Sequence, residues 1–150
     1  MSDLDFNLEN DFLPDPLVPQ GTYKGHITKT TFSDDSQCLT LSVTLDGNGG
    51  YCNDDSTDID GSVVTMRVWY PKEGDRDTMT GSGRQTKWQW KVNQIGKVAK
   101  ALGINLNTRE DMKSAVDAGD WIGTEVEAKV TIEEYNGEYS NSINAIKAVE

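Results

Sequence analysis

Alternating hydrophobic and polar residues mark the middle of the chain as β-structure. In residues 38–46 every second position is apolar, so that Leu39, Leu41, Val43 and Leu45 share one face and threonine and serine share the other. A period of two with one apolar face is typical of a half-buried strand. We therefore predict a strand over this segment.

Four more segments read as strands. They span residues 22–32, 62–70, 124–135 and 138–149. In the second of these, valine, methionine and tyrosine share one face, and Arg67 and Trp69 lie on the other. In the third, alternate residues from Val126 to Ile132 are expected to face inward. Asn136-Gly137 separates the last two segments, and this dipeptide predicts a tight hairpin turn.

The segment from Thr86 to Gly103 has a helical period instead. Its apolar stripe comprises Trp88, Val92, Ile95, Ala99 and Leu102. Thr86 and Gln89 have the spacing of a capping box, and Gly103 stands where a left-handed cap is favoured. Residues 108–118 predict a second, short helix with Thr108 as its N-cap.

The predicted order of elements is β-β-β-α-β-β, with the helix between strands 3 and 4 and a second short helix after it. This is the order of the OB-fold, a five-stranded Greek-key barrel, and we favour it over a generic α+β domain. Residues 20–150 would form this OB-fold domain. Residues 1–19 are acidic and contain three of the four prolines, so we expect an N-terminal arm rather than a helix there.

Charge is distributed unevenly along the chain. The protein has a formal charge of −11, yet residues 67–100 contain eight basic and three acidic side chains. The remaining residues therefore have a net charge of −16. An acidic protein is an unusual partner for nucleic acid, because such binding depends on pairing lysine and arginine with phosphates. The local basic segment keeps a nucleic-acid-binding function open.

The chain lacks the motifs of common enzymes. It contains one histidine, no phosphate-binding GxxxxGK loop and no metal-binding cysteine pattern. The acidic segment 54–61 fails the calcium-loop template, because Ile59 or Val63 stands where glycine is required. We predict a non-catalytic protein without a cofactor or a metal. No segment is apolar enough to span a membrane, and the two distant cysteines suit a reducing cytoplasm.

Several short motifs resemble a family of phage-encoded single-stranded DNA-binding proteins from replication and recombination modules. They are "VPQGTYKGHITKTTF", "LTLSVTLDG", "IGKVAKALGI" and "WIGTEVEAKVTIEEYNG", and the resemblance covers about residues 18–148. It implies an OB-fold that coats single-stranded DNA without sequence preference. It also suggests replication or recombination proteins as partners of the acidic arm, and an oligomer is compatible with it.

An OB-fold binds single strands on the outer face of strands 2 and 3 and on the adjoining loops, where bases stack on aromatic rings. This rule predicts a set of DNA-binding residues in strands 1 and 3, the 71–86 loop, the start of the helix and the terminal hairpin. The set is Lys24, His26, Arg67, Trp69, Lys72, Arg76, Arg84, Lys87, Trp90, Tyr135 and Tyr139.

Some of these aromatic residues have an alternative, structural explanation. The arm or a second subunit could cover Trp69, and Tyr135 and Tyr139 could form a cross-strand pair that stabilises the hairpin. Trp88 belongs to the apolar stripe and is expected in the core, whereas Trp90 and Lys97 are expected to be exposed. A helix that plugs the barrel would hold Trp90 away from the strand 2–3 face.

Two functional hypotheses follow. The first is a sequence-independent single-stranded DNA-binding protein in the host cytoplasm. The second is an acidic interaction protein, either a nucleic-acid mimic or an adaptor that inhibits or recruits a host protein. The charge of −16 outside the basic segment motivates this second hypothesis.

Overall fold

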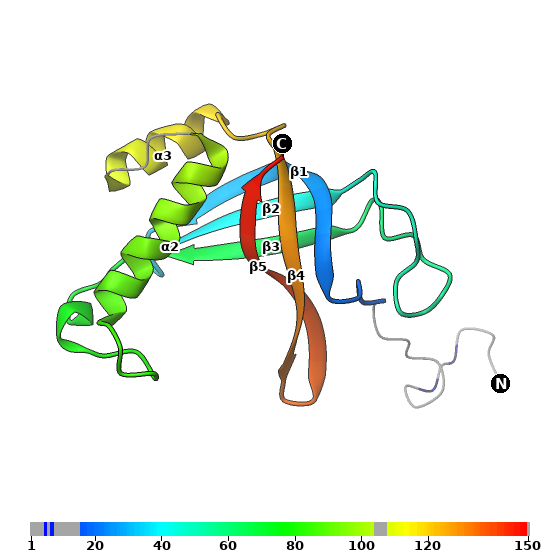
Figure 1. Ribbon diagram of the computed structural model, residues 1–150, viewed down its shortest axis with the longest axis horizontal. Helices are drawn as coiled ribbons and strands as arrows, with labels where there is room; N and C mark the ends of the chain where they lie inside the picture. The colour runs from blue at the N-terminus through cyan, green and yellow to red at the C-terminus, as the bar shows by residue number, and fades with distance from the viewer. Residues whose placement is uncertain (1–4, 6, 8–15, 104–107, 150) are drawn as a thin grey trace.

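A computed structural model describes residues 5, 7, 16–103 and 108–149 of the protein. Its strands are β1 (Gly21–Ser33), β2 (Cys38–Leu45), β3 (Val63–Trp69), β4 (Glu125–Tyr135) and β5 (Glu138–Ala148). Its helices are a short turn η1 (Asp75–Asp77), α2 (Lys87–Leu102) and α3 (Arg109–Ala118). All five predicted strands and both predicted helices are confirmed (Figure 1). Most of the predicted arm lies outside the described residues.

The strands form one antiparallel sheet in the order β3-β2-β1-β4-β5. β3 and β5 are its two edges, and no hydrogen-bonded ladder joins them. The expectation of a closed barrel is therefore wrong: the protein is mainly β, with an open sheet and two helices inserted between β3 and β4. Figure 1 shows α2 crossing beside the sheet, with the β4–β5 hairpin extending away from the body.

β1 is the central strand and bends sharply beside its neighbours. Gly25 pairs with Leu45 on β2 and with Val126 on β4. A Cβ atom at Gly25 would lie 2.6 Å from the carbonyl oxygen of Thr44, closer than real side chains approach backbone. Glycine is thus required here by the close contact between the β1 and β2 backbones.

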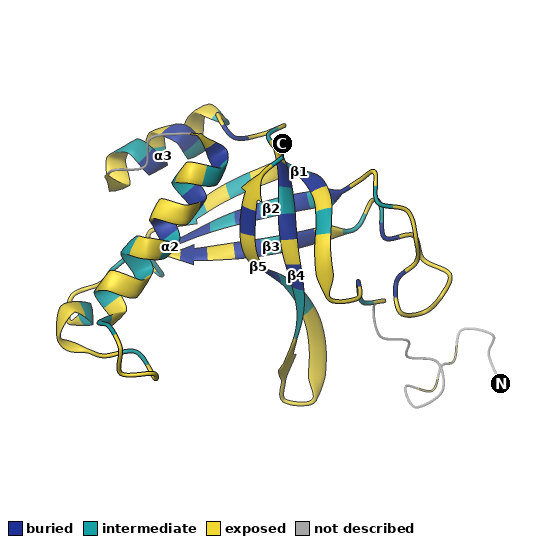
Figure 2. Ribbon diagram, viewed as in Figure 1, coloured by how far each residue is buried: buried dark blue, intermediate teal, exposed yellow. Residues whose placement is uncertain are grey.

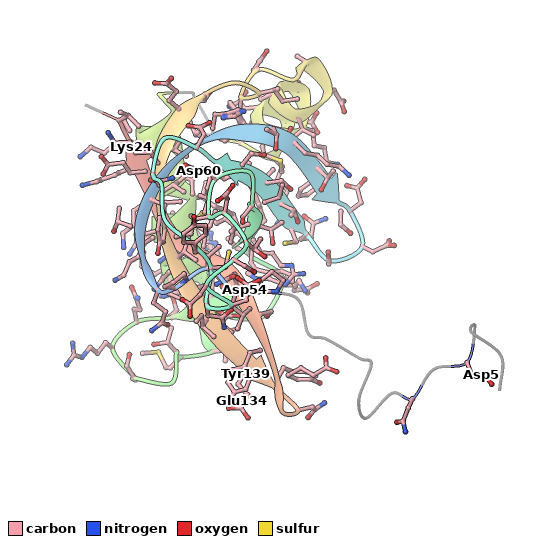
Figure 3. All side chains as sticks on the ribbon, turned by 90° about the vertical axis from the view of Figure 1, so that its right-hand side faces the viewer. Asp5, Lys24, Asp54, Asp60, Glu134 and Tyr139 are labelled. Carbon is pink, nitrogen blue, oxygen red and sulfur yellow. The ribbon has the colours of Figure 1, made fainter. Side chains whose placement is uncertain are left out.

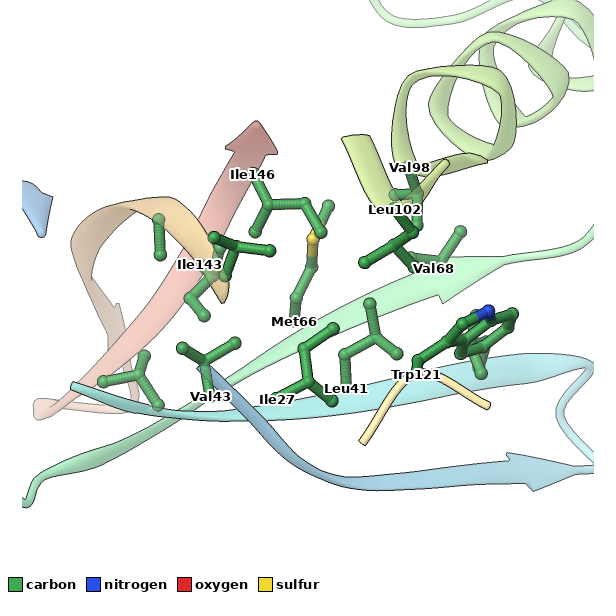
Figure 4. Packing of buried hydrophobic residues seen from close by; sticks show 14 of the residues in the cluster. Ile27, Leu41, Val43, Met66, Val68, Val98, Leu102, Trp121, Ile143 and Ile146 are labelled. Carbon is green, nitrogen blue, oxygen red and sulfur yellow. The ribbon is translucent and has the colours of Figure 1, made fainter. Parts of the chain in front are cut away.

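The core fills the space between the inner face of the sheet and α2. Val98 and Leu102 of α2 lie over Met66 and Val68 of β3, and Trp121 closes one end (Figure 4). The alternation predicted for β2 is confirmed, because its four inward residues are fully buried. Figure 2 shows this burial along the middle strands and an exposed surface along the outer side of α2. Each fully buried aliphatic side chain contributes about 1.5–3 kcal/mol to folding.

Two local predictions for α2 need correction. Thr86 caps the helix by accepting a hydrogen bond from the Gln89 amide, but the Gln89 side chain donates to Asn93 rather than completing a capping box. Trp88 is only partly buried, because it lines a cavity beside α2, and the guanidinium of Arg76 lies over its ring, 4.6 Å from the ring centroid. The predicted N-cap of α3 is confirmed, and there Thr108 and Asp111 do complete a capping box.

No helix in the described part of the chain is both long and apolar enough to cross a membrane.

Candidate functional site

A groove of about 270 Å³ lies where the edges of the sheet face each other. β3 supplies Arg67 and Trp69 to its lining, and α2 supplies Trp90 and Gln94. The β4–β5 hairpin forms the opposite wall. Its contributions are Thr131, Glu133, Ile143 and Asn144. The groove thus lies between β3 and the β4–β5 hairpin, where the two edges of the open sheet are not paired.

Local structure explains why these side chains reach the groove. Alternation along β3 buries Met66 and Val68 and turns Arg67 and Trp69 outward. Trp90 and Gln94 are four residues apart, so they lie on one face of α2. The expectation that the helix would hold Trp90 away from the β3 surface is therefore wrong.

Both tryptophans present accessible surface to the groove. Trp69 is 36% exposed and Trp90 is 41% exposed. In the described part of the chain Trp69 is thus not covered, although most residues of the predicted arm lie outside that part. Tryptophan is highly buried on average, and it is enriched at binding interfaces. Two such rings lining one groove form a surface on which flat molecules can stack.

Arg67 lines the groove, and a second cation, Lys72, lies beside the ring of Trp69. The ammonium of Lys72 is 5.8 Å from the ring centroid of Trp69, within range of a cation–π contact. Neither Lys72 nor Arg67 forms an ion pair with any described residue. Glu133 is the one carboxylate among the described residues that line the groove. The positive charges here therefore remain available to an anionic ligand.

The remaining basic candidates of the 71–87 segment lie around the start of α2. Arg76 is turned to the other flank of the helix, where it covers Trp88. Arg84 and Lys87 are exposed, and their side chains form no hydrogen bond or ion pair with described residues. Lys91, by contrast, is paired with Asp75 at 2.7 Å, and this contact holds the pKa of Asp75 below its ordinary value.

The hairpin tyrosines are exposed on opposite faces. Tyr135 is opposite Glu138, and Tyr139 is opposite Glu134. Since paired residues share a face and neighbours alternate, the two rings cannot form the suggested cross-strand pair. Tyr135 shares the face of Glu133, which lines the groove, and is 79% exposed. Figure 3 shows Tyr139 near the tip of the hairpin.

Lys24 and His26 lie at the other end of the sheet. His26 shares a hydrogen bond of 2.5 Å between its Nδ1 atom and Asp46, and Lys24 is opposite Glu127 on β4. The backbone of Lys24 is also tied to Asn48, at the start of the 47–61 loop. These two candidates therefore do not join the groove, and carboxylates surround them.

The acids of the 47–61 loop hold the loop itself together. Asp54 accepts hydrogen bonds from the hydroxyl and amide of Thr57 and from the amide of Ser56, which lower its pKa to about 2. Asp60 accepts from the amides of Gly49 and Asn48, which also lower its pKa. Figure 3 shows both carboxylates on the loop, on the same side of the molecule as Lys24.

Sequence reasoning missed the polar lining of the groove. Gln94, Thr131, Glu133 and Asn144 were not among the candidates. The four-residue spacing of Gln94 from Trp90 is a signal that could have identified it. The hairpin residues carried no such signal, because their proximity to β3 depends on how the sheet curls.

No protein-family model matches this chain, and no curated protein sequence is significantly similar to it. The geometry of the groove therefore provides the basis for a functional proposal.

Proposed function

We propose that this protein is a non-catalytic, largely sequence-independent single-stranded DNA-binding protein. The observation that carries the proposal is the convergence of Trp69 and Trp90 on one groove beside Arg67. Single strands are bound by aromatic rings on which bases stack and by cations that contact the backbone, and each stack contributes about 1–3 kcal/mol. The groove combines both kinds of group.

The fold is compatible with this proposal. The order β3-β2-β1-β4-β5, with the helices inserted between β3 and β4, is what an OB-fold becomes when it is opened between β3 and β5. OB-folds are often only partly closed, and they bind oligonucleotides on the face of strands 2 and 3 and on the strand 1–2 and strand 4–5 loops. The groove shares two of these elements, β3 and the β4–β5 hairpin.

Each part of the groove has a role in the proposal. Trp69 and Trp90 stack on bases, while Arg67 and Lys72 contact phosphates. Arg84 and Lys87 extend the basic surface beyond the groove, and Tyr135 offers a further ring on the hairpin. Because every base has a flat face and every nucleotide a phosphate, such contacts discriminate little between sequences.

The unpaired state of these cations supports binding to an anion. Phosphate contacts release counterions from the nucleic acid, so the affinity should fall as salt rises. The charge of −16 outside the basic segment, which motivated the alternative of an acidic interaction protein, includes the loop acids at the other end of the sheet. The resemblance to phage proteins extends the proposal to DNA replication and recombination in an infected host cell.

The test is fluorescence anisotropy of a labelled oligo-dT strand at low and high salt, with a duplex of equal length beside it. The proposal predicts salt-sensitive binding to the single strand, weak binding to the duplex and quenching of tryptophan fluorescence. No binding to the single strand at low salt would reject it and favour the acidic interaction protein.

A further inference from the structure

A second and larger cavity lies on the opposite flank of α2 from the groove. Its volume is about 630 Å³, and the 70–77 segment, α2 and the start of α3 surround it. Sites for small molecules typically measure about 300–1,000 Å³. Of the residues proposed above to contact DNA, Lys72 is the one that also lines this cavity.

The floor of the cavity is apolar. Val92, Ile95 and Ala99 of α2 form it, and Trp88 and Tyr70 contribute aromatic rings. Gly96 also lines it, and a Cβ atom at this position would meet nothing within 4 Å. Glycine inside a helix is destabilising relative to alanine. Gly96 is exposed, so the space beside it belongs to the open side of the cavity.

Tyr70 brings an unsatisfied polar group to this cavity. The residue is 4% exposed, and its buried hydroxyl has no hydrogen-bond partner among the described residues. Burial raises the pKa of this phenol to about 12, so it remains a protonated donor at neutral pH. Buried hydroxyls are nearly always hydrogen-bonded in folded proteins, and this one therefore calls for an acceptor.

Five charged side chains line the cavity: the cations Lys72, Arg76 and Arg109 and the carboxylates Glu73 and Asp77, so cations are in excess by one. Arg76 stacks on Trp88, and Arg109 lies 6.0 Å from the ring centroid of Tyr70 and donates to the carbonyl oxygen of Pro71. Neither arginine forms an ion pair within the described part of the chain. Guanidinium groups with donors to spare are suited to carboxylates and phosphates.

We propose that this cavity binds a small aromatic anion. Its ring would lie on the apolar floor formed by Val92, Ile95 and Ala99, beside Trp88, and its carboxylate or phosphate would face Arg76 and Arg109. A nucleoside monophosphate and an aromatic carboxylate share this chemistry. Neither Trp69 nor Trp90 lines this cavity, so the proposal stands even if the protein does not bind DNA.

The test is titration of the full chain with dTMP and, separately, with indole-3-acetate, followed by the NMR signals of the tryptophan indoles. We expect saturable binding of at least one probe at concentrations up to about 1 mM. Binding of dTMP alone would identify a nucleotide ligand, and binding of indole-3-acetate would identify an aromatic carboxylate. Binding of neither probe would overturn the proposal.

Variants at two lining positions locate the bound probe. Gly96→Leu adds a bulky side chain to the lining of the cavity and should abolish binding, whereas the matched Gly96→Ala adds a single methyl group and should preserve it. Arg109→Gln should weaken binding roughly tenfold by removing a charge-assisted hydrogen bond, and it keeps the test valid if Gly96→Leu fails to fold. Binding that survives both Gly96→Leu and Arg109→Gln, or that is lost in Trp69→Ala, would contradict the assigned site.

Discussion

The two ends of the sheet use charge in different ways. At the end that carries the 47–61 loop, Asp54 and Asp60 accept hydrogen bonds from backbone amides of that loop. At the groove, Arg67 and Lys72 form no ion pair with described residues and lie beside exposed tryptophan. At the loop end the carboxylates accept hydrogen bonds from their own chain. At the groove the cations have no ion-pair partner among the described residues and are available to a ligand.

This difference shows why net charge is a poor guide to function. The 47–61 loop contains four of the 25 acidic residues, and two of these, Asp54 and Asp60, serve as hydrogen-bond acceptors within the loop. The groove has few charges, but they are unpaired and adjacent to exposed rings. The state of pairing of each charged side chain, rather than the total charge, distinguishes a binding surface from a structural one.

The largest effect is expected from removing both rings of the groove. Trp69→Ala combined with Trp90→Ala should weaken binding to oligo-dT by about 1–3 kcal/mol for each stack lost. Both residues are exposed, so the fold should survive. Fluorescence anisotropy measures the affinity, and circular dichroism checks the fold.

Tyr51→Ala is the matched control for that variant. Tyr51 is 57% exposed, but it lies in the 47–61 loop at the other end of the sheet. Its removal should leave DNA affinity unchanged. If Tyr51→Ala lost as much affinity for oligo-dT as the double tryptophan variant, DNA binding would not be confined to the groove end of the sheet.

A smaller effect is expected from a single cation of the groove. Arg67→Gln removes one phosphate contact, which should lower the salt dependence of single-strand binding by about 0.7 in the slope of log K against log salt. Lys100→Gln removes an exposed cation near the other end of α2 and should leave the slope unchanged. Anisotropy titrations at four salt concentrations measure both slopes. Equal slopes for Arg67→Gln and the unmodified protein would exclude Arg67 from the interface.

A pH-dependent effect on stability is expected from Asp75. Its carboxylate accepts hydrogen bonds from the Lys91 ammonium and the Lys72 amide, which lower its pKa in the folded protein. A lowered folded pKa stabilises the protein above the ordinary pKa of aspartate, and the stabilisation is lost as the pH falls through the folded value.

Thermal unfolding measures this contribution. Asp75→Asn should lower the melting temperature at neutral pH, and its difference from the unmodified protein should shrink below about pH 4. Asp77→Asn, in the same turn, should have little effect at either pH. A difference that stays constant with pH would assign the effect to packing instead of charge.

The smallest effect is expected at Lys24 and His26. His26 is already bound to Asp46, and Lys24 is opposite Glu127. The double variant Lys24→Ala and His26→Ala should change DNA affinity less than about twofold, well below the effect of one lost stack. An anisotropy titration beside Trp69→Ala provides the comparison. A loss as large as that of Trp69→Ala would extend the DNA path across the whole sheet.

Elements of the fold were predictable because their patterns are local. The alternation from Leu39 to Leu45 and the cap at Thr108 depend on neighbours within a few residues. The closure of the sheet was not predictable, because it depends on whether β3 and β5 approach closely enough to pair. The alternation of apolar and polar residues contains no information on the distance between β3 and β5.

The candidate site was predictable only in part for the same reason. The alternation of β3 identified Arg67 and Trp69 as outward-facing. The position of Trp90 depends on how α2 packs beside β3 and β5. The periodicity of the helix sequence does not specify this packing. Trp88 was expected in the core because it falls on the apolar stripe, but the stripe does not reveal that Arg76 would cover its ring.

The most direct test of the central claim is photo-crosslinking of an oligonucleotide containing 5-iododeoxyuridine, followed by peptide mapping. If bases stack in the groove, the crosslinks should fall on the peptides that contain Trp69 and Trp90. Crosslinks confined to the 47–61 loop, or an absence of crosslinks while the strand is bound, would contradict the account.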